Sequence, residues 1–167
     1  MSEIFHRCRH LGIEMTREEY WAYLRECEKD STKRIRTQIG RYIFNEHDIC
    51  LNPERERISV SDSTCGWYVD VMTAECGNGV WVYGLWYNLG DGGGCFGASW
   101  ADRQTDRTRY DWHESERECK ASAGRCMLRY IDNHTKDKKG MLRKLRRKVE
   151  EYVRSMERPQ VVELSLF

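Results

Sequence analysis

The sequence predicts an α+β domain, in which an antiparallel sheet of four or five strands is packed by two helices and a basic C-terminal helix is peripheral. Three observations predict this class. Residues 66–100 hold four of the six tryptophans and alternate as strands between glycine-rich turns. Thr16 and Glu19 have the spacing of a capping box, which starts a helix. Apolar residues then recur at helical spacing after Trp112 and again over 137–157.

The stretch 66–100 is expected to form three strands. Gly77, Asn78 and Gly79 supply the residues with positive φ that a tight hairpin needs. The strand that follows, 80–89, is apolar on both faces, so one face must pack on helices and the other must be covered or form a binding surface. Gly84 in the middle of this strand predicts a bend or the close approach of another backbone.

The helices predicted to pack on this sheet begin near Thr16 and Trp112. The first runs from Met15 to about Asn45, with a break near Asp30 or Ser31, because its apolar residues keep helical spacing on both sides of a polar stretch. Residues 47–62 have the pattern of a hairpin or an edge strand. Residues 160–167 follow a proline and alternate like a short terminal strand.

The length of 167 residues fits a single domain over 1–167. Within it we expect a terminal segment (1–14), an α+β core (15–134), and a basic helix with a terminal strand (135–167). Lys and Arg number 28 against 27 Asp and Glu, so no field of the whole molecule favours nucleic acid or an anionic membrane. The chain shows no export signal and no membrane span, which predicts a cytoplasmic protein without a membrane partner. Its eight cysteines are then expected to be free thiols, most of them buried.

No catalytic constellation is recognisable, so we expect a protein that is not an enzyme and that has no catalytic residues and no cofactor. The chain lacks G-x-S-x-G, H-E-x-x-H and the local signatures of cysteine proteases. Gly92, Gly94 and Gly97 satisfy G-x-G-x-x-G, but a dinucleotide site needs a helix directly after its glycines, and residues 96–100 have an extended pattern. The glycine-rich loop is therefore expected to be a connection between strands.

One metal site has to be weighed near the N-terminus. His6, Cys8 and His10 alternate, so in a strand all three would share a face and reach one ion. Structural zinc sites commonly use four ligands in paired knuckles, and the chain has no C-x-x-C. We therefore expect a solvated terminal segment and assign no metal ligands. Whether these three residues bind a metal stays open at this point.

Two surfaces are candidates for binding. The aromatic sheet has acidic but no basic residues of its own, which favours a core role for most of its rings. The helix over 137–157 is basic: residues 136–158 carry ten basic and four acidic side chains, a net charge of +6. The candidate binding residues are Trp67, Trp81, Tyr83, Trp86 and Tyr87 on the sheet and Arg143, Lys144, Arg146 and Arg147 on the helix.

These surfaces lead to two functional hypotheses. The first is a non-enzymatic interaction module that acts on a protein partner. The alternative is an accessory protein that binds nucleic acid through the basic helix. A homo-oligomer is also a candidate, through a heptad-like apolar stripe on the same helix. Its residues are Leu142, Leu145, Val149, Tyr152 and Met156.

Residues 65–131 resemble a small β-β-β-α module of uncharacterised bacterial, phage and mobile-element proteins. The residues that carry the resemblance are Trp67, Gly79, Trp81, Tyr87, Gly90, Gly92, Gly93, Gly94 and Glu116. The resemblance implies an accessory role near nucleic-acid transactions or phage defence, and it implies no catalytic residues.

Overall fold

The computed structural model describes residues 3–60, 66–134, 137 and 140–159. Its largest element is a five-stranded antiparallel sheet with the order β5-β6-β7-β8, in which β9 also pairs with β7. This confirms the predicted class and the three strands over 66–100. The strands are β5 (Glu54–Ser59), β6 (Tyr68–Glu75), β7 (Trp81–Asn88), β8 (Gly93–Phe96) and β9 (Trp112–His113).

The tight turn between β6 and β7 has the predicted chemistry. Gly77, Asn78 and Gly79 all have positive φ, a conformation that glycine and asparagine adopt at low cost. The two strands pair residue by residue from Glu75 opposite Trp81 to Tyr68 opposite Asn88. This long pairing makes the β6–β7 hairpin the centre of the sheet.

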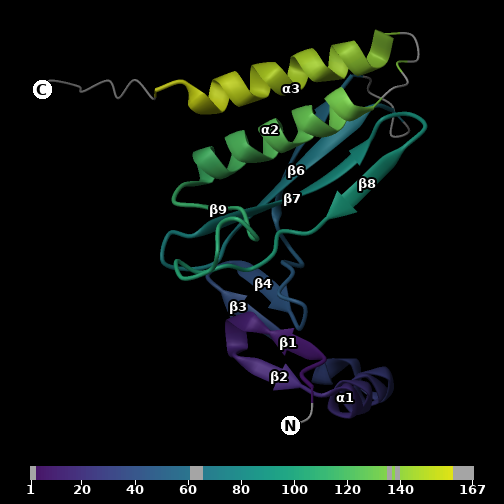
Figure 1. The fold of residues 1–167 in the computed structure, drawn as a ribbon, viewed down its shortest axis with the longest axis vertical. Coiled ribbons are helices and arrows are strands. Elements are labelled where there is room, and N and C mark those ends of the chain that lie inside the picture. The colour runs from purple at the N-terminus through teal and green to yellow at the C-terminus, as the bar shows by residue number, and fades with distance from the viewer. Residues whose placement is uncertain (1–2, 61–65, 135–136, 138–139, 160–167) are drawn as a thin grey trace, which may run out of the picture.

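Two helices cover one face of the sheet (Figure 1). They are α2 (Glu116–Asn133) and α3 (Met141–Glu157), which run antiparallel to each other. Val71 and Leu85 project from the sheet into the main core, where Met127 of α2 and Leu145 of α3 are completely buried. The prediction of a peripheral C-terminal helix is therefore wrong, because the apolar stripe of α3 packs inside the domain.

The first predicted helix is correct at its start and wrong in its length and position. Helix α1 (Arg17–Lys29) begins with the capping box of Thr16 and Glu19. It ends at Asp30, whose carboxylate accepts from the backbone N–H of Thr32, because such local bonds compete with a continuing helix. In Figure 1, α1 lies beside the small β1–β2 sheet, far from the helical layer, so α3 takes the place on the large sheet that was predicted for α1.

The residues after α1 form strands instead of a second helical half. β3 (Arg36–Ile39) and β4 (Tyr42–Asn45) make a second small sheet, and β1 (His6–Cys8) and β2 (Ile13–Met15) make the first. Phe44 of β4 packs in a second core with Ala74 and Val82, on the face of the large sheet that the helices leave free. The β3–β4 hairpin thus covers one end of that face.

Gly84 of β7 is the point where another backbone approaches, as predicted. A Cβ atom at this position would lie 2.5 Å from the carbonyl oxygen of Phe96 and 2.6 Å from the nitrogen of Ala98. Both neighbours are backbone atoms, so neither can rotate away. The chain that leaves β8 can therefore cross β7 only where a side chain is missing.

We expect Gly84→Ala to destabilise the fold by about 1–3 kcal/mol or more, since overpacking forces the backbone to shift. Gly92→Ala is the matched control, because its Cβ would meet only the ring of His134 at 3.6 Å. Urea unfolding followed by circular dichroism measures both. Equal midpoints for the two variants would contradict the close approach.

The apolar stripe of α3 is not available for a homo-oligomer. Leu145 and Val149 have no exposed surface, and Leu142 is 7% exposed. Tyr152 packs against the same core and donates a hydrogen bond to Glu56 at 3.0 Å. The predicted homo-oligomer through Leu142, Leu145, Val149, Tyr152 and Met156 is therefore wrong, because these positions include the contact between α3 and the rest of the domain.

Leu145→Ala tests this correction. It should lower the free energy of unfolding by about 2–5 kcal/mol, as for other buried leucines, without changing the mass of the protein in solution. Arg147→Ala, on the outward side of α3, should change it by less than about 0.5 kcal/mol. Denaturant unfolding and light scattering give the two readouts. A fall in mass caused by Leu145→Ala would restore the oligomer hypothesis.

The remaining sequence predictions have mixed outcomes. All seven cysteines in the described ranges are free thiols and five of them are buried, as expected. None of the helices in these ranges is long and apolar enough to cross a membrane. The strand predicted over 160–167 lies outside the described residues.

Candidate functional site

The sheet separates the predicted aromatic residues into covered and exposed rings. Trp67 and Tyr83 are buried in the main core, and Trp81 and Tyr87 are half-buried against it. Trp86, which has the opposite orientation in β7, is 47% exposed. Most of these rings therefore stabilise the fold, as the absence of basic residues in 66–100 predicted, and Trp86 is the accessible one.

Strand pairing places charged residues beside Trp86. Asp70 of β6 lies directly opposite both Arg57 of β5 and Trp86 of β7, so the three side chains share one face. Val69 and Val71, which flank Asp70, point the other way into the core under the helices. The face with Asp70 is thus the one that α2 and α3 leave free.

A half-buried ion pair between Arg57 and Asp70 organises this face. Arg57 donates to Asp70 through Nε at 2.6 Å and through its second terminal nitrogen at 2.8 Å. Arg55 lies 3.5 Å from the same carboxylate. Asp70 has no exposed surface, whereas the two arginine side chains are 45–46% exposed. The bidentate bond raises the pKa of the Arg57 guanidinium, so this side chain stays charged.

Each arginine also lies over an aromatic ring. The guanidinium carbon of Arg57 is 4.2 Å from the centroid of Tyr68, and that of Arg55 is 5.4 Å from the centroid of Trp86. These distances are within the range of cation–π attraction. We call the four residues Arg55, Arg57, Tyr68 and Trp86 the ring–arginine patch. The carboxylate of Asp70 and the two aromatic rings together hold both guanidinium groups in place.

Arg55 and Arg57 are not among the residues predicted from the sequence, although their strand contains a signal for them. In Glu54–Ser59 acidic and basic residues alternate, and alternation in a strand sends the two kinds to opposite faces. Glu56 indeed contacts Lys120 of α2 on the covered face, whereas Arg55 and Arg57 lie on the free face. The aromatic stretch has no basic residue of its own, but the neighbouring strand provides two.

The predicted basic residues of α3 are mostly paired within the helical layer. Arg143 contacts Asp137 at 3.0 Å, Arg146 contacts Asp132 and Glu150, and Arg147 lies 3.7 Å from Glu151. For Lys144 the described residues provide no ion pair. Exposed pairs contribute little energy, but they neutralise much of the local field. Asp137, Glu150 and Glu151 are already included in the net charge of +6 for residues 136–158, and Asp132 of α2 adds one further acidic partner.

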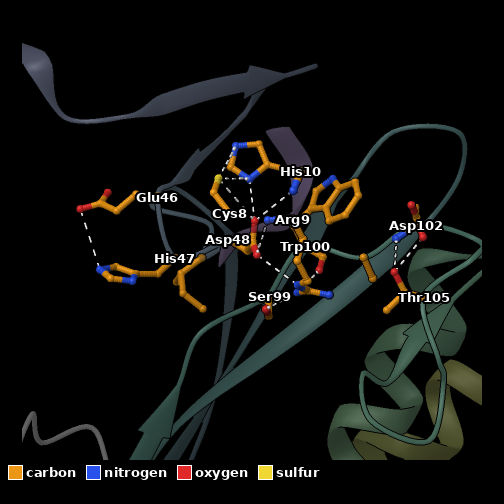
Figure 2. Close-up of polar contacts among 12 residues, drawn as sticks. Cys8, Arg9, His10, Glu46, His47, Asp48, Ser99, Trp100, Asp102 and Thr105 are labelled. Atoms are coloured by element: carbon orange, nitrogen blue, oxygen red, sulfur yellow. Dashed lines mark hydrogen bonds and ion pairs between the residues drawn. The ribbon is translucent and has the colours of Figure 1, made fainter. Parts of the chain in front are cut away.

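The N-terminal segment forms a third site, which was predicted to be solvated. In Figure 2, Cys8 and His10 converge on Asp48. Cys8 has no exposed surface, and the side chains of His10 and Asp48 are 1% and 5% exposed. His6 does not join them, because its Nε2 bonds to the carbonyl oxygen of Glu46 at 2.8 Å. The prediction of a solvated segment is wrong for Cys8 and His10.

Asp48 was missed because it is 38 residues from His10 in the chain. Its carboxylate is bound by the Nδ1 atom of His10 at 2.7 Å and by two nitrogens of Arg9 at 3.0 Å. Burial opposes ionisation, yet the hydrogen bonds from His10 and Arg9 keep the pKa of Asp48 below its ordinary value. Asp48 also has a φ of 63°, which aspartate tolerates better than most residues.

The thiol of Cys8 is protected rather than reactive. Burial and the charge of Asp48 raise its pKa to about 11, so at neutral pH the proton stays on sulfur. A cysteine nucleophile requires the opposite shift. The cluster of Cys8, His10 and Asp48 therefore brings together one thiol, one imidazole and one carboxylate without the electrostatics of a cysteine hydrolase.

The glycine-rich loop is a connection between strands, as predicted. Leu89 donates its backbone N–H to the carbonyl oxygen of Gly92 at 2.7 Å, and β8 begins at Gly93. Since a strand follows these glycines, the loop has no helix N-terminus that would hold a pyrophosphate.

Comparisons of the chain with protein-family models, with curated proteins and with solved structures found no match. A function can therefore be argued only from the sites themselves.

Proposed function

We propose that the protein is a non-enzymatic binding module that holds a protein partner against the ring–arginine patch. The observation that carries this proposal is the exposure of Trp86, which is 47% accessible although β7 is paired on both sides at this position, with β6 and β8. An accessory role of this kind also agrees with the resemblance to modules of phage and mobile-element proteins.

The composition of the patch supports a protein partner. Tryptophan, tyrosine and arginine are the residues that contribute most often to the binding energy of protein interfaces. Here Asp70 and the rings already restrain Arg55 and Arg57, so binding costs little further side-chain entropy. The two arginines and Asp70 sum to a charge of only +1, which suits a mixed apolar and polar interface.

The first test uses the full-length chain as bait. Immobilised wild type, Trp86→Ala and Trp21→Ala are incubated with a lysate of the producing cells, and bound proteins are quantified by mass spectrometry. Trp21 is the matched control, because it is 50% exposed but lies on α1, away from the sheet. We expect a protein that wild type and Trp21→Ala retain and Trp86→Ala loses.

The purified partner should then bind Trp86→Ala at least about 30-fold more weakly, as expected for a central interface residue worth about 2 kcal/mol. Calorimetry measures the two affinities. Equal retention by all three baits would contradict the proposed surface. Circular dichroism of each variant separates loss of binding from loss of fold.

Single-stranded nucleic acid is the second candidate, and one observation favours it. Guanidinium planes beside exposed rings offer stacking surfaces for bases, and β5 places two arginines next to Tyr68 and Trp86. The basic helix is the other candidate carrier of this function, through Arg143, Lys144, Arg146 and Arg147. Three of these residues have acidic partners, as Arg55 and Arg57 have Asp70.

Oligonucleotide binding at a series of salt concentrations distinguishes the candidates. If Arg55 and Arg57 each contact a phosphate, log K should fall with log salt at a slope of about −1.4, and Arg55→Gln should reduce that slope by about half. A protein complex that persists at high salt, without any oligonucleotide binding at low salt, would eliminate the nucleic-acid candidate.

A further inference from the structure

Three atoms with lone pairs converge in the N-terminal cluster. Sγ of Cys8 lies 3.3 Å from Nδ1 of His10 and 3.8 Å from Oδ1 of Asp48, and Nδ1 and Oδ1 are 2.7 Å apart. Two lone pairs repel each other, so each of these contacts is favourable only when a proton or a cation lies between the two atoms. One ion at the centre of the three would satisfy all of them together.

The separations are close to those around a tetrahedral zinc ion. With Zn–S of 2.3 Å and Zn–N and Zn–O near 2.1 Å, ligand atoms lie about 3.4–3.6 Å apart. The two distances from Cys8 Sγ bracket this range. The contact between His10 and Asp48 would have to open by roughly 0.7 Å to reach it. Zinc binding would therefore require the His10 ring or the Asp48 carboxylate to rotate away from the other.

The geometry points to a zinc site formed by Sγ of Cys8, Nδ1 of His10 and Oδ1 of Asp48 (Figure 2). Thiolate, imidazole and carboxylate are the three ligand types that zinc takes from proteins. The set mixes a soft sulfur with harder nitrogen and oxygen, which disfavours calcium and magnesium. In the described part of the chain the cluster has three members, so a fourth position is left for water or another small ligand.

Further contacts orient the ligands as they do in known zinc sites. Oγ1 of Thr37 lies 2.9 Å from Nε2 of His10, the ring nitrogen that faces away from the cluster. With Nδ1 on the metal, Nε2 carries the proton and donates it to this hydroxyl. Arg9 binds Oδ2 of Asp48 through two nitrogens, and Oδ1, which faces the cluster, accepts from the backbone N–H of His10 at 3.2 Å. Each of these two ligands thus has a separate partner that sets its direction.

Cys8 would lose its thiol proton to solvent as the zinc–sulfur bond forms, and Asp48 would bind as the carboxylate. In the bound state His10 is a neutral imidazole with its proton on Nε2, because Nδ1 is the ligand atom. The thiolate and the carboxylate then balance the two charges of the ion.

The ion would join segments that are distant in sequence. Cys8 is the last residue of β1 and His10 lies in the 3-10 turn that follows it, Arg9–Leu11. Asp48 lies 40 residues after Cys8, in the connection that follows β4. Zinc would therefore tether the N-terminal hairpin to the β3–β4 hairpin and stabilise the folded chain.

The experiment uses the reduced full-length protein, stripped with a chelator and then titrated with Co²⁺ alone. We expect one equivalent to bind, with visible bands of four-coordinate cobalt and a near-ultraviolet band from sulfur. Zn²⁺ should displace the cobalt and raise the midpoint of thermal unfolding. Cys8→Ser should lose the sulfur band, whereas Cys95→Ser should keep it, because Cys95 is exposed on β8.

A second variant keeps the test decisive if Cys8→Ser does not fold. Thr37→Val retains all three ligands and removes only the partner of His10, so it should bind cobalt about 10–100-fold more weakly. Absence of cobalt and zinc binding by the folded wild type would overturn the proposal. A sulfur band of unchanged intensity in folded Cys8→Ser, or unchanged affinity in Thr37→Val, would also overturn it.

Discussion

The pairing of β6 with β7 is the contact on which the other features depend. Its register runs over eight residue pairs and decides which side chains lie under α2 and α3. Side chains alternate between faces, so a shift of one residue would place Asp70 under the helices and Val71 on the face of Trp86 and the two arginines. The burial of Asp70, the exposure of Trp86 and the close approach at Gly84 all follow from this register.

The parts of the fold that could be predicted are those determined by nearby residues. The turn at 77–79 needs positive φ at three consecutive positions, and the capping box of Thr16 and Glu19 is closed within three residues. Both signals lie within a few consecutive residues, so the sequence alone indicates the turn and the start of the helix. The end of α1 at Asp30 is local too, but the helical spacing of Ile35 and Ile39 concealed it.

Partners of the helices could not be predicted in the same way. An amphipathic pattern shows that a helix buries one face, but not what it is buried against. The stripe of α3 looked suitable for self-association because its heptad spacing fits another helix. In the structure the other helix is α2, and the basic residues that surround the stripe contact acidic residues of the same layer.

In both sites, the residues that are close in sequence could be predicted to lie together, whereas those brought in by strand pairing or tertiary contacts could not. Alternating charges in β5 would have placed Arg55 and Arg57 on one face, but Asp70 joins them only through strand pairing. For the N-terminal cluster, the spacing of Cys8 and His10 correctly suggested a shared location. Asp48 joins that location only through the tertiary fold, and His6 leaves it because the backbone of Glu46 provides a closer partner.

The edge of β7 opposite β6 has a consequence for how this chain can vary. β8 pairs with residues 85–88 of that edge and β9 with Trp81 and Val82, so the segment between them leaves the sheet and returns to the same strand. Its outer part, 103–109, is largely exposed and contains short turns built by Asp102 and Asp106. A loop anchored at both ends on one strand can change length without altering the register. We therefore expect the loop 103–109 to tolerate inserted sequence, in relatives of the protein or in engineered variants that carry a reporter.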